Sequence, residues 1–391
     1  MYVDLTPEQT AFRDELREYF AEMMTPELVE EIRGSEGGGP LYRKALRRMG
    51  ADGLLGVGWP KEYGGRGMSP IEQFIYSDEV QRAGFPLPFL TLSTVGPTLM
   101  HFGTEEQRQD FLPRILAGEC HFAIGYSEPS AGTDLASLKT RGVRDGDEWV
   151  INGQKVFTSL ANFADYIWLA ARTDPAAPKH RGISMFIVPT TADGYSCTPT
   201  WTMSGLRTNS TFYEDVRVPA RNLVGGENNG WSLIVNQLNH ERVSLMNVGP
   251  SDRTYQDVVA WAREARMADG SRVIDQPWVQ LNLARYKAKL EILRLMNWKQ
   301  AWAMTRGALH PADSSAVKVF GSEFYIEGYN LLLEVLGAPG TLKGSSPAAV
   351  LRGQLEMRYL ASPILTFGGG TNEVQRDIIA MAGLQLPHYK D

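Results

Sequence analysis

The spacing of apolar residues changes twice along the chain, and these changes constrain the fold more than any other feature. In the first hundred residues apolar side chains recur three and four positions apart, as at Phe12 and Leu16, which is typical of helices. From about residue 120 short aromatic and β-branched runs are separated by Gly, Pro, Asn and Asp, which is typical of strands. Helical spacing then returns for the rest of the chain. We therefore predict an all-α domain over 1–119, a β-rich domain over 120–227 and a helical domain over 228–391.

Local signals place several elements within these domains. A Thr or Ser followed three positions later by Glu or Gln is a capping box, and it predicts helix starts after Thr6, Ser69 and Thr104. An Asn152-Gly153 pair follows the apolar run at 149–151, which predicts a turn. No strand is followed by GxGxxG, so a Rossmann domain is disfavoured. Further strands are expected over 166–169, 183–188 and 212–218, and helices over 278–306, 313–336, 347–361 and 372–382.

Composition and charge argue against several classes of protein. Charged residues make up 21% of the chain and the net charge is −6, which disfavours a nucleic-acid or anionic-membrane binder. No apolar run approaches the ~20 residues that span a bilayer. Cys120 and Cys197 form no CxxC pair, which disfavours a disulfide scaffold or a cysteine-ligated metal site. The chain start shows no secretory signal, and we expect a cytoplasmic protein.

Four segments carry the candidate functional residues. Residues 125–134 (GYSEPSAGTD) combine small residues and hydroxyls, which would let a planar or phosphorylated ligand approach the backbone, although a hydrogen-bonded turn explains them equally well. Residues 152–159 (NGQKVFTS) alone indicate a hairpin. Together with 216–219 (VRVP) and 368–380 (GGGTNEVQRDIIA), in this order, they make the whole chain resemble the acyl-CoA dehydrogenase family.

The resemblance implies a fold and a reaction. The expected fold is acyl-CoA dehydrogenase-like, with an N-terminal all-α domain, a middle β-barrel and a C-terminal four-helix bundle that enclose FAD. The expected reaction is α,β-dehydrogenation of an acyl-CoA thioester, in which a carboxylate removes the α-proton and a hydride passes from the β-carbon to flavin N5. Such a site needs a base, donors to the thioester oxygen and exclusion of water.

The position of the base departs from much of the family. Many members carry a Glu where this chain has Gly369, but isovaleryl- and long-chain acyl-CoA dehydrogenases use the Glu of a Glu-Arg pair on a bundle helix. The segment Asn239-His240-Glu241-Arg242 matches that arrangement. By resemblance Glu241 is the candidate catalytic base, and the alternative is an ordinary Glu-Arg pair on a helix surface.

The other roles are carried over from the family by position. Tyr126 and Ser127 would contact the flavin ring, which Phe157 would flank, although core packing is the alternative for both aromatic residues. Ser159 would hydrogen-bond near N5, and Thr133 would line the substrate or the FAD phosphates. The backbone of Gly369 and Gly370 would approach the thioester. Arg242 would orient the substrate channel or Glu241. The FAD adenosine would be reached by Thr371, Asn372 and Glu373.

Three departures from the family pattern stand out, and the first two concern the half of the FAD site that a neighbouring subunit donates in many homotetrameric members. Residues 263–272 lack the usual Phe-Gly, and Glu334 replaces a Gln near the diphosphate, where negative charge is unfavourable. Gly249-Pro250 interrupts the helix that follows Glu241 and is expected to kink it. Room for a bulky ligand with fused rings is one explanation, and a packing feature is an equal alternative.

With these departures, residues 125–134, 237–243 (QLNHERV) and 367–379 (FGGGTNEVQRDII) make the chain resemble the catalytic subunit of actinobacterial steroid side-chain acyl-CoA dehydrogenases, which are α2β2 heterotetramers. That resemblance implies a second acyl-CoA dehydrogenase-like subunit, a cholesterol-derived acyl-CoA substrate of β-oxidation, and an electron-transferring flavoprotein as acceptor. The alternatives are a catalytically silent partner subunit, an acyl-CoA oxidase, a short branched-chain acyl-CoA dehydrogenase, and a flavin monooxygenase on the same fold.

Overall fold

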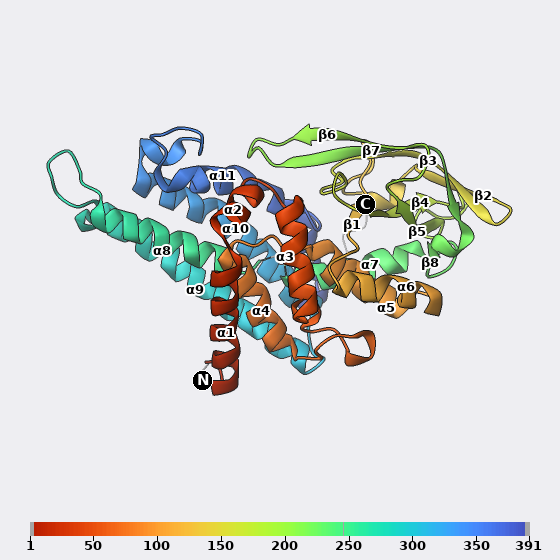
Figure 1. Ribbon diagram of the computed structural model, residues 1–391, viewed down its shortest axis with the longest axis horizontal. Coiled ribbons are helices and arrows are strands. Elements are labelled where there is room, and N and C mark those ends of the chain that lie inside the picture. The colour runs from red at the N-terminus through yellow and green to blue at the C-terminus, as the bar shows by residue number, and fades with distance from the viewer. Residues whose placement is uncertain (1–3, 245, 388–391) are drawn as a thin grey trace.

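The computed structural model describes residues 4–244 and 246–387, without the side chains of residues 238–244. A helical part, a sheet and a second helical part follow one another along the chain (Figure 1), which confirms the predicted order of the fold. The first part contains α1 (Pro7–Met23), α2 (Pro26–Ile32), α3 (Pro40–Ala51), α4 (Pro70–Ala83), α5 (Gly96–Phe102) and α6 (Glu105–Leu116).

The capping signals start the helices where the sequence predicts. The side chains of Thr6, Ser69 and Thr104 accept backbone N–H bonds at the starts of α1, α4 and α6, and a Gln or Glu side chain bonds back each time. These reciprocal bonds satisfy amide donors that a helix leaves unpaired at its start.

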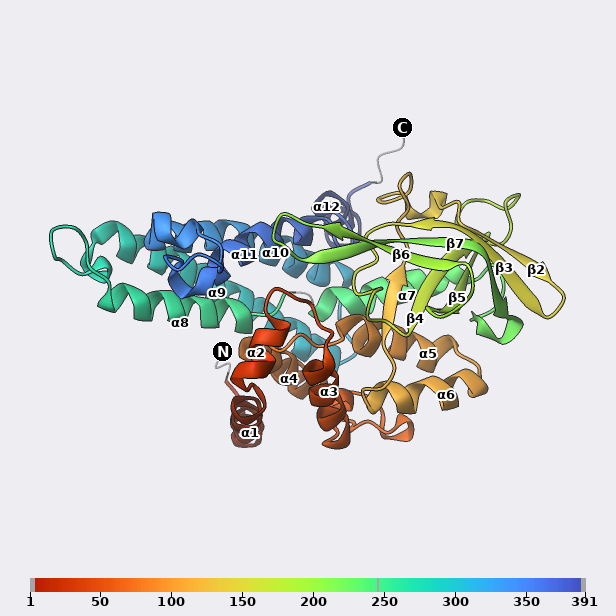
Figure 2. The same ribbon diagram turned by 45° about the horizontal axis from the view of Figure 1, so that its top comes forward.

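The middle part is one eight-stranded sheet with its own core. Its strands are β1 (Phe122–Gly125), β2 (Arg141–Asp145), β3 (Glu148–Lys155), β4 (Tyr166–Arg172), β5 (Ile183–Pro189), β6 (Tyr195–Trp201), β7 (Arg207–Pro219) and β8 (Leu223–Val224). The order is β6-β7-β3-β2-β4-β5-β8, and β1 pairs in parallel with β4. Residues of five strands, among them Trp149, Phe186 and Tyr213, share one buried cluster, so the sheet wraps around a common interior. Figure 2 shows the long β6–β7 hairpin reaching from the sheet toward the C-terminal helices.

The predicted turn at Asn152-Gly153 is wrong. Strand β3 continues through both residues, and its register against β7 shifts between Ile151 and Gly153, which marks a bulge. The Asn152 side chain donates to Asp215 Oδ1 at 2.9 Å and accepts from the Asp215 backbone at 3.0 Å. Because Asn152 bonds across to β7, the Asn-Gly pair bends a continuing strand instead of ending it.

The C-terminal part consists of packed helices. They are α7 (Gly230–Ser244), α8 (Gly249–Glu264), α9 (Pro277–Thr305), α10 (Pro311–Leu336), α11 (Gln354–Ala361) and α12 (Asn372–Ile378). Helices α8, α9 and α10 lie side by side (Figures 1 and 2), and α7, α11 and α12 pack against α10. The helix predicted from 347 begins only at Gln354, because Leu351, Arg352 and Gly353 have positive φ angles and form a tight turn.

Gly249-Pro250 begins a helix and does not kink one, so the predicted kink is wrong. Pro250 occupies the first turn of α8, where a backbone N–H has no helical partner to lose. A Cβ on Gly249 would lie 2.2 Å from the carbonyl oxygen of Asp78 on α4, and the Gly249 N–H donates to Asp78 Oδ1 at 2.6 Å. The glycine therefore permits close contact between α4 and α8.

A single buried cluster joins the first helical part to the sheet and to α7. It contains Leu99, Phe122, Trp168, Leu233 and Ile234, each at most 2% exposed. None of the helices in the described part of the chain is both long and apolar enough to cross a membrane.

Candidate active site

Helix α7 lies where the three parts of the chain meet. It packs against β5, α5, α10 and the π-helical turn Thr91–Val95, and Figure 2 shows it between the sheet and the long helices. Glu241 and Arg242 belong to α7, but their side chains lie outside the described residues. Gln237, four positions before Glu241, is fully buried.

Tyr126 links residues 125–134, which we call the first motif, to α7. Its hydroxyl donates to Gln237 Oε1 at 2.5 Å, and Trp168 Nε1 donates to the Tyr126 hydroxyl at 3.2 Å. The tyrosine ring is buried in the cluster that joins the three parts. Residues i and i+4 share one face of a helix, so the Tyr126 contact lies one helical turn before position 241.

The first motif lies beside the second motif, residues 152–159. The Val156 N–H donates to the Ser127 carbonyl at 2.8 Å. Beneath them Lys155 Nζ donates to the Tyr126 carbonyl at 3.0 Å and to Glu128 Oε1 at 2.8 Å. Lys155 is fully buried and Glu128 is 6% exposed.

Electrostatics at this pair favour two opposite charges. Burial lowers the pKa of Lys155 to about 8, against the attraction of Glu128. Burial alone would raise the pKa of Glu128, but Lys155 and the N–H donors of Lys139 and Thr140 outweigh it and lower that pKa.

Three predicted residues of these motifs lie at or near the surface. Phe157 has φ +57° and is 68% exposed, although Lys155, two positions earlier, is fully buried. A positive φ is uncommon for a bulky residue and indicates a local constraint. Ser159 donates to Thr208 Oγ1 at 3.3 Å, and Thr133 is exposed in the loop after β1.

The C-terminal motif is anchored on α10. Gly369 and Gly370 have φ +69° and +97°, which glycine adopts without strain. The buried Lys318 Nζ donates to the Gly370 carbonyl and to Asn372 Oδ1, both at 2.7 Å, and the Asn372 amide donates to Ser322 Oγ at 2.9 Å.

The residues that follow the glycines begin α12. The Thr371 hydroxyl accepts from the Val374 N–H at 3.2 Å and so caps the helix, while Glu373 is exposed. Because α10 also packs against α7, the C-terminal motif and position 241 belong to neighbouring elements.

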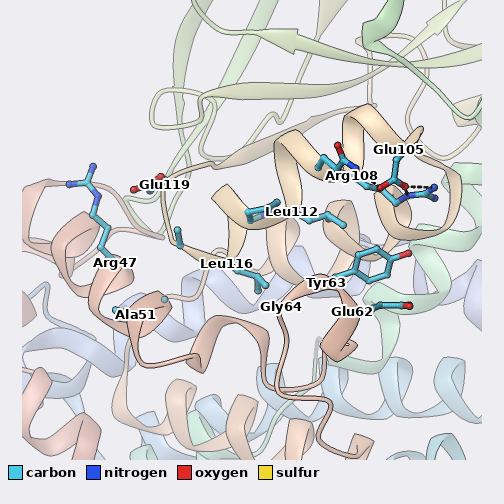
Figure 3. Close-up of a pocket in the computed structure, with 14 residues that line it drawn as sticks. Arg47, Ala51, Glu62, Tyr63, Gly64, Glu105, Arg108, Leu112, Leu116 and Glu119 are labelled. Carbon is cyan, nitrogen blue, oxygen red and sulfur yellow. Dashed lines mark hydrogen bonds and ion pairs between the residues drawn. The ribbon is translucent and has the colours of Figure 1, made fainter.

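A groove of about 710 Å³ lies elsewhere, between α3, α6 and the turn at 61–64. Figure 3 shows Arg47, Tyr63, Leu112 and Leu116 along it, with Glu105 and Arg108 paired at one end. None of the predicted site residues lines it. The described side chains also contain no group of His, Cys, Asp and Glu that could hold a metal ion.

Comparison with known proteins identifies the family. The acyl-CoA dehydrogenase N-terminal, middle and C-terminal domains match residues 6–119, 123–216 and 228–384. Acyl-CoA dehydrogenase FadE26 of Mycobacterium tuberculosis is 55% identical over 99% of both chains, and FadE29 of the same organism is 50% identical over 99% of both. The chain belongs to the acyl-CoA dehydrogenase family. It is therefore an oxidoreductase that acts on acyl-CoA, as the sequence resemblance predicts.

Solved acyl-CoA dehydrogenase structures confirm the fold. The ChsE4-ChsE5 complex from Mycobacterium tuberculosis contains a chain with 55% identity and a TM-score of 0.93, and the match covers all of both chains. The Tcur3481-Tcur3483 steroid ACAD contains one with 52% identity and a TM-score of 0.94, again over all of both chains.

The structure shows where two of the departures from the family pattern lie and what surrounds them. Residues 263–272 lie where α8 leads into α9, at the end of the helical part farthest from the sheet (Figure 1). Glu334 on α10 accepts amide N–H bonds from Asn282 at 2.8 Å and Asn330 at 3.1 Å.

The residues that hold the motifs of this acyl-CoA dehydrogenase in place were not predicted from its sequence. Glu128 and Lys155 lie inside the motifs, and two charged residues in otherwise small or apolar segments were an available signal. Gln237 and Lys318 gave no such signal, because polar residues are common on helices and only the fold shows them buried.

Proposed function

We propose that this chain is the catalytic subunit of an FAD-dependent acyl-CoA dehydrogenase that introduces an α,β double bond into the CoA thioester of a steroid side chain. The observation that carries the proposal is the Tyr126–Gln237 hydrogen bond, because it ties the first motif to α7 one turn before position 241. The steroid part is supported by the 52% identity to a chain of the Tcur3481-Tcur3483 steroid ACAD over its full length.

The chain's own residues would supply the acid–base chemistry. Glu241 would accept the α-proton, and Arg242 would orient Glu241 or the substrate. Backbone N–H groups at Gly369 and Gly370 would bind the thioester oxygen, where negative charge develops as the proton leaves. The hydrogen bonds from Lys318 to Gly370 and Asn372 support this role, since they fix the loop that would bear those donors.

The first two motifs have the properties of an FAD-binding surface. Phe157 is an exposed aromatic on a constrained backbone, as a residue that flanks a planar ring should be. Ser127, Ser159 and Thr133 lie beside it or in the adjoining loop and carry hydroxyls for the flavin and its phosphates. Bound FAD would supply the acceptor for the hydride.

Fewer residues would contact the FAD adenosine than the resemblance implies. The Asn372 amide is buried and bonded to Lys318 and Ser322, so we assign it to anchoring the loop. Thr371 and Glu373 remain the proposed adenosine contacts. Tyr126 is 9% exposed, so it would contact the flavin over a small part of its surface.

A second acyl-CoA dehydrogenase-like subunit would complete the enzyme as an α2β2 tetramer. One similar solved structure is the ChsE4-ChsE5 complex, and the other, the Tcur3481-Tcur3483 steroid ACAD, also carries two names. In addition, α9 exposes an apolar stripe with heptad spacing, a pattern typical of a helix that packs on a partner. Its large apolar members are Trp278, Leu281, Ile292, Leu295 and Trp302, each 44–55% exposed.

The proposal is tested on the complex that purifies with the tagged chain from its own host. Anaerobic addition of a steroid side-chain acyl-CoA should bleach the flavin absorbance, and an electron-transferring flavoprotein should then accept the electrons. Glu241→Gln keeps the side-chain shape but cannot accept a proton, so turnover should fall about 10²–10⁴-fold while FAD stays bound.

A matched control is Glu15→Gln on the exposed face of α1, which should leave turnover unchanged. Normal turnover in Glu241→Gln would remove this chain from the catalytic role and favour a silent partner subunit.

A further inference from the structure

The two motifs that would face FAD each contribute one member of a buried ion pair. Glu128 comes from the loop after β1 and Lys155 from the last position of β3, 27 positions apart along the chain. We infer that the Glu128–Lys155 pair is the positioning element that fixes the two FAD-contacting segments relative to each other. This inference rests on the proposed function, because it concerns how the chain holds FAD.

The pair connects three strands through its hydrogen bonds. Lys155 Nζ holds the Tyr126 carbonyl at 3.0 Å, at the end of β1. The Glu128 carboxylate accepts the N–H groups of Lys139 at 2.6 Å and Thr140 at 2.8 Å, just before β2. The exit of β1, the entry of β2 and the end of β3 are therefore joined at one buried point.

The segment after Lys155 is held from its other side as well. The Thr158 N–H donates to the Asn209 carbonyl at 2.9 Å, and the Asn209 amide donates to the Thr158 carbonyl at 3.0 Å. Between these anchors Phe157 has its positive φ of +57°. Backbone strain of this kind persists only where the surroundings over-determine the conformation, and Lys155 and Asn209 are those surroundings.

Stability alone does not account for the pair. Removing two charges from water is costly, and a buried ion pair is often no more stabilising than apolar residues of the same volume. Apolar residues could match the pair in stability, but they could not hydrogen-bond the Tyr126 carbonyl or the two N–H groups at Glu128, and these bonds fix the two loops. The pair therefore provides geometry at the surface where Ser127 and Phe157 would meet the flavin.

The experiment separates positioning from stability. In Lys155→Met/Glu128→Gln both charges are removed, the volume is kept, and the Gln oxygen can still accept an N–H bond. The tagged complex is purified from its host, and its thermal midpoint and its Kd for FAD are measured, the latter by flavin fluorescence after equilibrium dialysis. We expect the thermal midpoint to fall by several degrees, because the buried Tyr126 carbonyl loses its donor. The Kd for FAD should rise at least about 10-fold.

Val216→Ala provides the matched control. Val216 is fully buried on β7 in the sheet core and lies outside residues 125–134 and 152–159, so the substitution leaves a cavity and lowers the midpoint without removing a hydrogen bond of the ion pair. Its Kd for FAD, measured below its midpoint, should equal that of the wild type. Where the double variant melts too low to be measured, Lys155→Met alone is judged by the same criterion, because Glu128 then keeps the N–H donors of Lys139 and Thr140 and can become neutral by taking up a proton.

Two results overturn the inference. One is a Kd for FAD within about two-fold of the wild type in the double variant. The other is a loss of FAD affinity in Val216→Ala as large as that in the pair variants. A wild-type complex that binds no FAD is a different result, because it refutes the proposed function itself.

Discussion

Tyr126 and Gln237, which are 111 positions apart, share a buried hydrogen bond of 2.5 Å between the tyrosine hydroxyl and the glutamine carbonyl oxygen. Trp168 Nε1 donates to the same hydroxyl at 3.2 Å, so the hydroxyl both accepts and donates. The short chain Trp168–Tyr126–Gln237 joins β4, the end of β1 and α7. It adds side-chain hydrogen bonds to the packing of α7 against β5, and so ties the sheet to the helix that carries position 241.

Tyr126→Phe should therefore destabilise the protein without changing its packing. The substitution leaves the Trp168 indole N–H and the Gln237 carbonyl oxygen buried without this partner, which costs about 1–3 kcal/mol. Urea unfolding of the purified complex measures the loss. Tyr19→Phe is the matched control, because the Tyr19 hydroxyl bonds to Asp52 at the surface and its loss should cost under about 1 kcal/mol.

The Tyr126 variant should also react more slowly, since α7 loses its tie to the sheet beside position 241. The equal loss of stability in both tyrosine variants would contradict the importance of the buried link.

Signals that act over a few residues were enough to predict many elements. The side chains of Thr6 and Gln9 each accept the other residue's backbone N–H within one turn of helix, so no tertiary contact is needed to start α1. Predictions failed where a distant residue decides the outcome. Asn152 would form a turn on its own, but Asp215 from β7 bonds to its side chain and keeps the strand going.

The same limit applies to the candidate site. The motifs identify where ligands would bind, because their residues form contiguous segments. Gln237 and Lys318 act through partners 111 and 52–54 positions away, at Tyr126 and at Gly370 and Asn372, and no local pattern marks them. At Gly249 the helix-breaking character of the residue predicted a kink. The close contact with Asp78 on α4, which explains why glycine is needed there, leaves no mark in the local sequence.

Gly369→Glu should impair the enzyme when Glu241 is present. Two carboxylates directed at one substrate carbon disfavour joint ionisation. The φ of +69° at this position adds strain for any residue other than glycine. In the Glu241→Gln background the same change should restore part of the turnover, measured as flavin bleaching, because the new carboxylate can act as the base. Glu241→Gln/Gly369→Ala carries the strain without a carboxylate, and recovery there too would contradict the explanation.

Lys318→Met should loosen the C-terminal glycine loop. The Gly370 carbonyl and the Asn372 side-chain oxygen would each lose a donor at 2.7 Å, and we expect the free energy of unfolding to fall by about 2–4 kcal/mol. Urea unfolding measures this, and KM for the acyl-CoA should rise as well. Lys289→Met removes an exposed pair with Glu327 and should change stability by no more than about 0.5 kcal/mol. A similarly small effect at Lys318 would rule out its role as an anchor.

Asp78 should make stability depend on pH between about 4 and 6. Burial raises the pKa of its carboxyl to about 6, although the Gly249 N–H partly opposes this. The folded state thus binds the proton more tightly than the unfolded state, so this contribution to stability is complete below about pH 4 and is lost as the pH rises through 6.

Asp78→Asn keeps an oxygen for the Gly249 N–H but carries no charge. We expect the variant to equal the wild type near pH 4 and to exceed it by about 1–2 kcal/mol at pH 7. Urea unfolding at a series of pH values measures the difference. The exposed Asp193→Asn should give a constant difference across the series, and a constant difference for Asp78→Asn would refute the assignment.

Assembly should depend on the exposed stripe of α9. The stripe runs from Trp278 to Trp302, about 36 Å at 1.5 Å per residue, which is long enough for an extended helix–helix contact. Ile292→Lys/Leu295→Lys places two charges in that contact, so native mass spectrometry of the purified complex should show the α2β2 species, with two FAD, replaced by smaller ones. Val143→Lys changes an equally exposed apolar residue on β2 and should leave the tetramer intact. If the chain expressed alone forms a stable homotetramer with four FAD, the second subunit is unnecessary, because identical copies would then complete every FAD site.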